Sequence, residues 1–218
     1  MKTALSALFI AAAPLSLANA ADLDAYEEAA PAINWSGFYV GVHGGGGRTS
    51  VDAAYVPNGP AASLSGGGAL GGVQAGYNWQ LDQFVVGVEG DISATGIGAA
   101  IDCPNPAFSC ESDTNWLGSV RGRAGISFDK LLLYGTAGVG FGGIKVFTDN
   151  GTQFGERKTE TGWVAGAGVE YAISERLSVK AEFLHYDFGA RNFEVDNGLV
   201  IRADHKFNTG KIGINFKF

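Results

Sequence analysis

Nine charged residues lie on one side of stretches whose alternate positions are apolar or small. Four are acidic and five are basic: Glu89, Asp91, Glu170 and Glu182 against Arg121, Arg123, Lys180, Lys211 and Lys217. Paired carboxylates are common general acids and bases in enzymes. Nearby arginines, however, favour the ionised form of a carboxylate and suppress that chemistry. The pattern therefore favours salt bridges over a catalytic site, and no enzymatic activity is predicted.

The elements that position these charges are predicted to be β-strands. Eight stretches alternate with period two, which is the side-chain period of a strand. They span residues 35–47, 68–79, 83–93, 115–128, 131–142, 162–172, 177–187 and 208–218. In the last stretch Ile212, Ile214, Phe216 and Phe218 share one face, and Lys211 and Lys217 share the other. Because the apolar face of each stretch carries no charge, it is suited to contact lipid.

Short and long connections between the stretches alternate strictly. The short ones lie near 80–82, 129–130 and 173–176, and the long ones cover about 48–67, 93–115, 143–161 and 188–206. Outer-membrane barrels have tight periplasmic turns and long external loops, and a tilted strand of about ten residues crosses the hydrocarbon. The sequence therefore predicts an all-β fold, an eight-stranded antiparallel transmembrane up-and-down β-barrel.

Aromatic residues cluster at both ends of the predicted lipid-facing surface. Tyr77, Trp79, Phe84, Phe128, Tyr171 and Phe218 lie next to the short turns, whereas Trp116, Phe141 and Trp163 lie next to the long connections. Two such girdles are typical of membrane barrels.

The interior of an eight-stranded barrel is just wide enough to be filled by side chains, so charges inside it must be paired. We expect a lumenal salt-bridge network formed by Glu89, Asp91, Arg121, Arg123, Glu170, Lys180, Glu182 and Lys211. In that network the carboxylates of the third stretch meet the arginines of the fourth.

The N-terminal region is predicted to be an export signal followed by a lead-in. Residues 1–20 combine Lys2, an apolar run and the small residues Ala18 and Ala20, which is typical of a cleaved signal peptide. Residues 21–34 are acidic and unpatterned and are expected to lie in the periplasm, and residues 35–218 form the barrel. The formal charge of −7 argues against a nucleic-acid partner.

Two further residue types are candidates for site chemistry. Cys103 and Cys110 lie in a predicted long connection of an exported chain and are expected to form a disulfide. His43, His185 and His205 are expected near the end with the long connections and are too far apart in the sequence for a local metal motif, so no metal is predicted. A haem bound by His43 or His205 is the alternative.

Several segments resemble the outer-membrane immunogenic protein family, which are small opacity-type barrels of Gram-negative envelopes. They are residues 35–41, 120–125, 132–139 and the end at Phe218. The resemblance implies a porin-like eight-stranded barrel exposed as a surface antigen, with haemin binding or porin activity in some relatives. The terminal strand with Phe216 and Phe218 resembles the signal that the barrel-assembly machinery reads.

The expected protein is thus a non-enzymatic component of the outer membrane that acts through four long external loops. Its expected partners are outer-membrane lipid, the assembly machinery and host or extracellular ligands at the loops, and no cofactor is expected. A haemin receptor and a low-conductance porin are the alternatives. No peptidoglycan-binding domain follows the predicted barrel, so no wall-anchoring role is expected.

Overall fold

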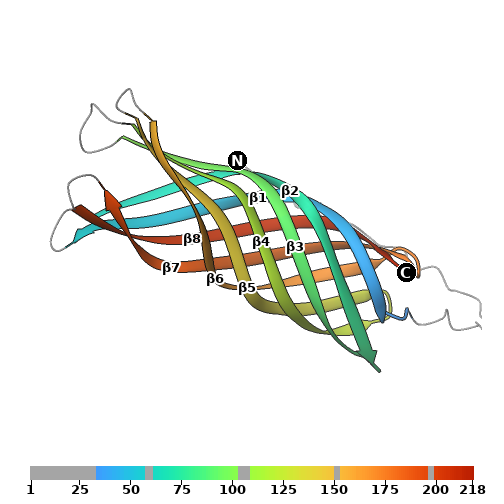
Figure 1. The fold of residues 1–218 in the computed structure, drawn as a ribbon. Coiled ribbons are helices and arrows are strands. Elements are labelled where there is room, and N and C mark those ends of the chain that lie inside the picture. Colours follow the sequence, from blue (N-terminus) through green and yellow to red (C-terminus); the bar gives the residue numbers. More distant parts are fainter. Residues whose placement is uncertain (1–32, 57–60, 103–108, 150–152, 196–198) are drawn as a thin grey trace, which may run out of the picture. The chain divides into compact units, whose positions relative to one another are not determined.

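Eight antiparallel strands close into a single barrel in the computed structural model (Figure 1). The structure describes residues 33–56, 61–102, 109–149, 153–195 and 199–218, and their side chains in 33–50, 65–97, 114–143, 159–190 and 204–218. The strands are β1 (Gly37–Val56), β2 (Ala61–Leu81), β3 (Phe84–Asp102), β4 (Ser109–Phe128), β5 (Leu131–Asp149), β6 (Gln153–Ala172), β7 (Leu177–Val195) and β8 (Leu199–Lys217). Within these ranges, no helix is long and apolar enough to cross a membrane. The predicted fold class is confirmed.

The strands are strongly tilted, which can be read from the register. A path of paired residues that leaves β1 at Phe38 returns to β1 at Arg48, ten residues further along the strand. With strands about 4.8 Å apart and a rise of about 3.3 Å per residue, this shift corresponds to a tilt of roughly 40°. The height of a residue in the barrel therefore depends on its strand as well as on its position along that strand.

The two faces of the strands separate as the alternation predicts. Large apolar residues on the outer face are exposed, including Val42, Val73, Phe84, Val120, Leu133, Trp163, Phe183 and Ile212. The aromatic residues next to the short turns are exposed as well, with Phe218 at 71 %. In an aqueous protein this surface would be a large apolar patch, whereas in a bilayer it is the face that contacts lipid.

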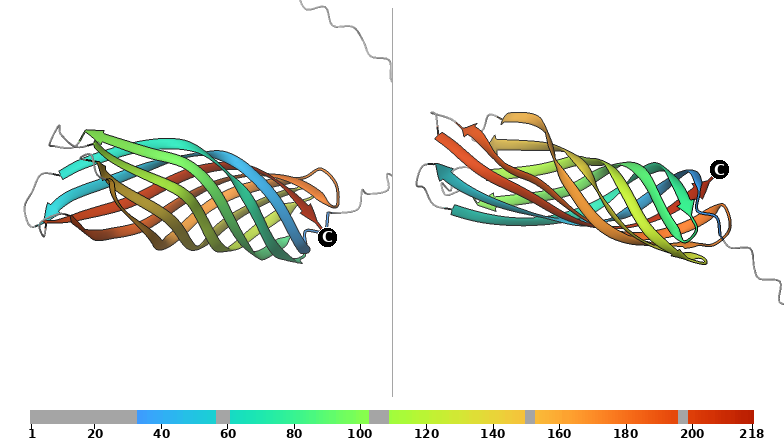
Figure 2. Two further views of the ribbon diagram at one scale, coloured as in Figure 1. Left: turned by 45° about the horizontal axis from the view of Figure 1, so that its top comes forward. Right: turned by 90° about the horizontal axis from the view of Figure 1, so that it is seen from below.

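Three connections are tight turns at one end of the barrel, which also holds the C-terminus (Figure 2). Asp82 and Asp129 have φ angles of 56° and 52°, in the left-handed region. Aspartate is one of the few residues besides glycine that tolerates this region in turns. The short turns were predicted near these positions.

The prediction of four long loops and ten-residue strands is wrong. The strands have 19 to 21 residues, and most of 48–67, 93–115, 143–161 and 188–206 is paired strand. On β1, for example, the pairing with β8 continues from Arg48 to Val56. Beyond the aromatic girdle the outer face meets water instead of lipid, so it no longer needs apolar residues and the alternation disappears. The backbone pairing does not depend on that alternation and continues.

Buried side chains fill the lumen, and three successive layers of them lie between the short turns and the buried residues Glu160 and His205. A lower apolar cluster near the short turns contains Ile33, Trp35, Val85, Leu132, Tyr134 and Ala172. A middle layer holds buried charged residues. An upper apolar cluster, which we call the septum, contains Ile97, Leu117, Val164, Leu184, Tyr186, Phe188 and Phe207.

Candidate functional site

Arg121 is the centre of the charged layer. Its guanidinium, carried by β4, lies 2.6 Å from Glu89 and 3.2 Å from Asp91 on β3, and 3.0 Å from Glu182 on β7. The planar guanidinium offers several donors in a fixed geometry, which suits it to bridge carboxylates on more than one strand. A single cation thus links two walls of the barrel.

Arg123 forms the second branch, closer to the short turns. Its guanidinium lies 2.7 Å from Glu170 on β6 and donates a 3.0 Å hydrogen bond to the hydroxyl of Tyr39. It also lies over the ring of Tyr134, 3.9 Å from the ring centroid. The Tyr39 hydroxyl donates in turn to Glu89 at 2.7 Å, so the two branches are joined.

Two lysines complete the set of ion pairs. Lys180 lies 2.8 Å from Glu89, and Lys211 lies 2.6 Å from Asp91. The eight predicted lumenal residues are all buried, and each takes part in at least one ion pair. They comprise four carboxylates and four cations, so the layer is formally neutral. The arrangement stabilises charges inside a narrow barrel, and every carboxylate in it is engaged by a cation.

Neutral polar residues extend the network, and of these only His43 was considered above, as a possible haem ligand. His43 hydrogen-bonds Gln74 through Nδ1 and Ser93 through Nε2, the latter at 2.7 Å. Gln74 donates to Asn215 at 2.7 Å, and Asn215 donates to Glu170 at 2.8 Å. The signal was present in the sequence, because these residues share the alternating face that carries the charges.

Glycines on the inner face leave the space that these side chains occupy. A Cβ added at Gly76 would lie 2.4 Å from the Tyr39 hydroxyl, and one at Gly168 would lie 2.5 Å from the Tyr134 hydroxyl. The two tyrosines thus extend over the backbone of neighbouring strands, where only glycine leaves room for them.

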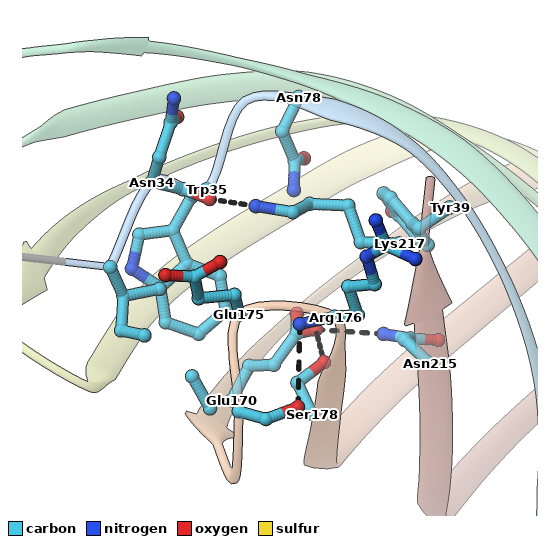
Figure 3. A pocket seen from close by; sticks show the side chains of 13 residues that line it. Asn34, Trp35, Tyr39, Asn78, Glu170, Glu175, Arg176, Ser178, Asn215 and Lys217 are labelled. Carbon is cyan, nitrogen blue, oxygen red and sulfur yellow. Dashed lines mark hydrogen bonds between the residues drawn. The ribbon is translucent and has the colours of Figure 1, made fainter.

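A small cavity of about 20 Å³ lies at the end of the barrel with the short turns (Figure 3). Glu170, Tyr39 and Asn215 of the network line it, together with Trp35 and Lys217. A cavity of this size has room for about one water molecule. The charged layer therefore approaches the end with the short turns through polar residues and a small void.

The residues before β1 close this end. Trp35 and Ile33 are buried in the lower cluster, and the Trp35 backbone N–H donates to Gln80 at 2.6 Å. Lys217, expected among the lumenal charges, is only partly buried and donates from Nζ to the backbone carbonyl of Asn34. The lead-in predicted for 21–34 thus packs against the barrel at Ile33, and its earlier residues lie outside the described part of the chain, as does the predicted signal peptide.

His43 and His205, each considered as a possible haem ligand, lie at different heights in the barrel. His43 lies within the polar layer of the lumen, with both ring nitrogens hydrogen-bonded, and not at the end with the long connections. His205 pairs with Val51, which is eight residues beyond His43 on β1, and faces Glu160 at 3.8 Å. Eight residues of strand span roughly 26 Å. The expected height of His43 was wrong because β1 continues to Val56, beyond the predicted end of the stretch at residue 47.

The remaining predicted residues have simple placements. His185 lies on the outer face of β7 with its ring centroid 5.4 Å from that of Trp163. Phe216 and Phe218 are exposed on the lipid-facing side at the end of β8, with their ring centroids 5.4 Å apart. The proposed pairing of Cys103 and Cys110 lies outside the described side chains.

Comparison with known proteins places these features among bacterial outer-membrane proteins. Residues 5–218 match the family model described as "Outer membrane protein beta-barrel domain". The chain is 35 % identical to the 31 kDa outer-membrane immunogenic protein of Brucella melitensis, over 96 % of this chain and 97 % of that protein. It is also 35 % identical to a 22 kDa outer membrane protein of Rhizobium leguminosarum bv. viciae, over 86 % of this chain and 80 % of that protein. Among solved structures, the outer membrane protein OprG from Pseudomonas aeruginosa has a TM-score of 0.50 at 12 % identity, over 84 % of this chain and 97 % of that chain.

Proposed function

The chain belongs to the outer-membrane protein β-barrel family, and from its filled, charge-balanced lumen we propose that it is a non-enzymatic structural and interaction protein of the cell envelope. It is an integral barrel of the outer membrane. The observation that carries the proposal is the charged layer, in which eight buried residues neutralise one another across the lumen. Carboxylates held in ion pairs are poor candidates for acid–base catalysis.

The surface that acts on partners is the external end of the barrel. Strands continue past the aromatic girdle, as β1 does from Arg48 to Val56 and β8 does from Leu199 to Phe207. Beyond the girdle the paired strands form a rigid scaffold. Binding and antigenic residues commonly lie on connections that a rigid scaffold positions. We assign the role of surface antigen to this end, and assembly to the terminal aromatic residues Phe216 and Phe218.

The test is the exposure of the two ends in intact cells. An epitope tag inserted at residues 57–60, between β1 and β2, is expected to bind antibody on intact cells. The matched tag between Asp129 and Lys130, in the turn between β4 and β5, is expected to bind only after the outer membrane is permeabilised. Heat-dependent mobility on a gel shows that each tagged protein is folded. Equal labelling of both tags, or a folded protein whose 57–60 tag stays unlabelled, would contradict the proposed surface role.

A further inference from the structure

The septum is the second filled layer of the lumen, and it differs from the charged layer in being apolar. All seven of its side chains are 2 % exposed or less. On each strand that carries both layers, the septum residue is farther from the short turns than the network residue is. Leu117 follows this order relative to Arg121 on β4, and Phe207 does so relative to Lys211 on β8. The septum therefore lies between the charged layer and the external end.

The septum draws residues from seven of the eight strands, counted over the described side chains. Its side chains come from β3, β4, β6, β7 and β8. Glycines line the septum on two of the remaining strands: a Cβ at Gly47 on β1 would lie 2.8 Å from Ile97, and one at Gly140 on β5 would lie 2.8 Å from Tyr186. Phe188 packs against Phe207 of the neighbouring strand, with ring centroids 5.6 Å apart, and it also reaches β5, where a Cβ added at Gly142 would lie 3.2 Å from its ring and 3.3 Å from Leu117.

The lower end of the lumen is closed differently. The small cavity beside Trp35 is lined by Glu170 and Asn215, which belong to the polar network. From there hydrogen bonds lead through Gln74 to His43 and Ser93. Water or an ion entering through this cavity, which lies beside the lower apolar cluster, would meet polar partners up to the level of Ser93 and then the apolar septum.

We propose that the septum, and not the salt-bridge network, is the barrier that makes the barrel impermeable to ions. An ion in a narrow apolar segment loses its hydration shell and gains no polar partner, which is how hydrophobic constrictions block conduction. A charged layer contains polar groups that can replace the water molecules lost by an entering ion. Its free-energy barrier to ion passage is therefore lower. The inference rests on the proposed closed barrel and names the element that closes it.

The experiment measures ion conductance of the full-length folded protein in planar lipid bilayers. The double substitution Phe188→Ala/Phe207→Ala, which opens the septum, is expected to raise the current about tenfold or more over the unaltered protein. Two controls keep the septum intact. Phe183→Ala/Ile212→Ala removes comparable apolar volume from the lipid-facing side of the same two strands. Asp91→Asn/Lys211→Met removes the two ion pairs of Asp91, with Lys211 and with Arg121, and keeps the layer formally neutral. Both controls are expected to stay at the current of the unaltered protein.

Folding of every variant is checked by heat-dependent gel mobility before conductance is measured. If the double septum variant does not fold, Leu117→Asn provides the test, because it makes the septum polar with little change in volume. A folded septum variant that stays silent overturns the inference, as does conduction by Asp91→Asn/Lys211→Met equal to that of the septum variant. Steady conduction by the unaltered protein instead overturns the proposed closed barrel.

Discussion

The charged layer and the septum occupy neighbouring heights of one lumen, yet they are stabilised in different ways. In the charged layer each side chain depends on specific partners, such as Arg121 on three carboxylates. In the septum, residues such as Leu117 and Phe207 depend on close packing. Removing one member of a buried ion network leaves unpaired charge, whereas removing an apolar side chain leaves a cavity. The first defect is local and electrostatic, and the second scales with the volume lost.

The comparison also bears on conformational specificity. Ion pairs across the lumen fix which strands face one another, because Arg121 reaches β3 and β7 and Arg123 reaches β6. Apolar packing tolerates substitution by other apolar residues of similar volume. We therefore expect the stability of the barrel to depend on the identity of the residues in the charged layer. In the septum it should depend on the volume of the side chains.

The largest effect is expected for Arg121→Ala. The substitution leaves Glu89, Asp91 and Glu182 without their shared cation, and unfolding free energy should fall by about 3–5 kcal/mol. The measurement is urea unfolding of the barrel in lipid vesicles, followed by gel mobility. Arg121→Lys keeps the charge but not the planar geometry, so its unfolding free energy should fall by less than that of Arg121→Ala. A loss below about 1 kcal/mol for Arg121→Ala would show that the network is not stabilised by its central cation.

Leu117→Ala in the septum should have the next largest effect, a loss of about 3 kcal/mol in the same unfolding assay. The matched control is Val120→Ala on the outer face of β4, where the side chain is exposed to lipid. Lipid tails are as apolar as the side chains they contact, so the unfolding free energy of this control should fall by about 1 kcal/mol or less. Equal losses at both positions would mean that the septum is loosely packed.

The glycines that make room for the polar layer should have a smaller effect. Gly168→Ala places a Cβ 2.5 Å from the hydroxyl of Tyr134, and overpacking of this kind costs about 1–3 kcal/mol. Gly210→Ala is the matched control on β8, since no atom lies within 4 Å of its added Cβ. Unfolding free energies that change equally in both variants would show that Tyr134 can move aside without loss.

The sequence was sufficient to predict the barrel and the charged layer for one physical reason. Lipid on one side and a narrow lumen on the other impose strict alternation, so Arg121 and Glu89 could be assigned to the same interior before the structure was known. The septum could not be predicted in this way. Leu117 and Phe207 are apolar residues on the inner face, so the alternation that assigns charged residues to the lumen does not distinguish them from residues that face lipid.

Heights inside the barrel could not be predicted either. They depend on the ten-residue shift around the barrel, which arises only when all eight strands pair. His43 was expected too close to the external end for a further reason: its strand was expected to end at residue 47, where the alternation ends, whereas β1 continues to Val56. Backbone hydrogen bonding sets the real end of a strand and leaves little trace in side-chain polarity.

The smallest effect is expected for a substitution that removes one hydrogen-bonding hydroxyl and leaves the packing of the ring unchanged. Tyr39→Phe removes only the hydroxyl that donates to Glu89 and accepts from Arg123, and should reduce unfolding free energy by about 1 kcal/mol. Tyr77→Phe is the control, because its ring lies on the outer face against Trp79 and its exposed hydroxyl is close to the membrane interface. Glu89 keeps Arg121 and Lys180 when Tyr39 loses its hydroxyl, so the loss should stay well below that of Arg121→Ala. If Tyr39→Phe instead matches Arg121→Ala, the network is cooperative, and its stability resides in the connected hydrogen bonds more than in any one cation.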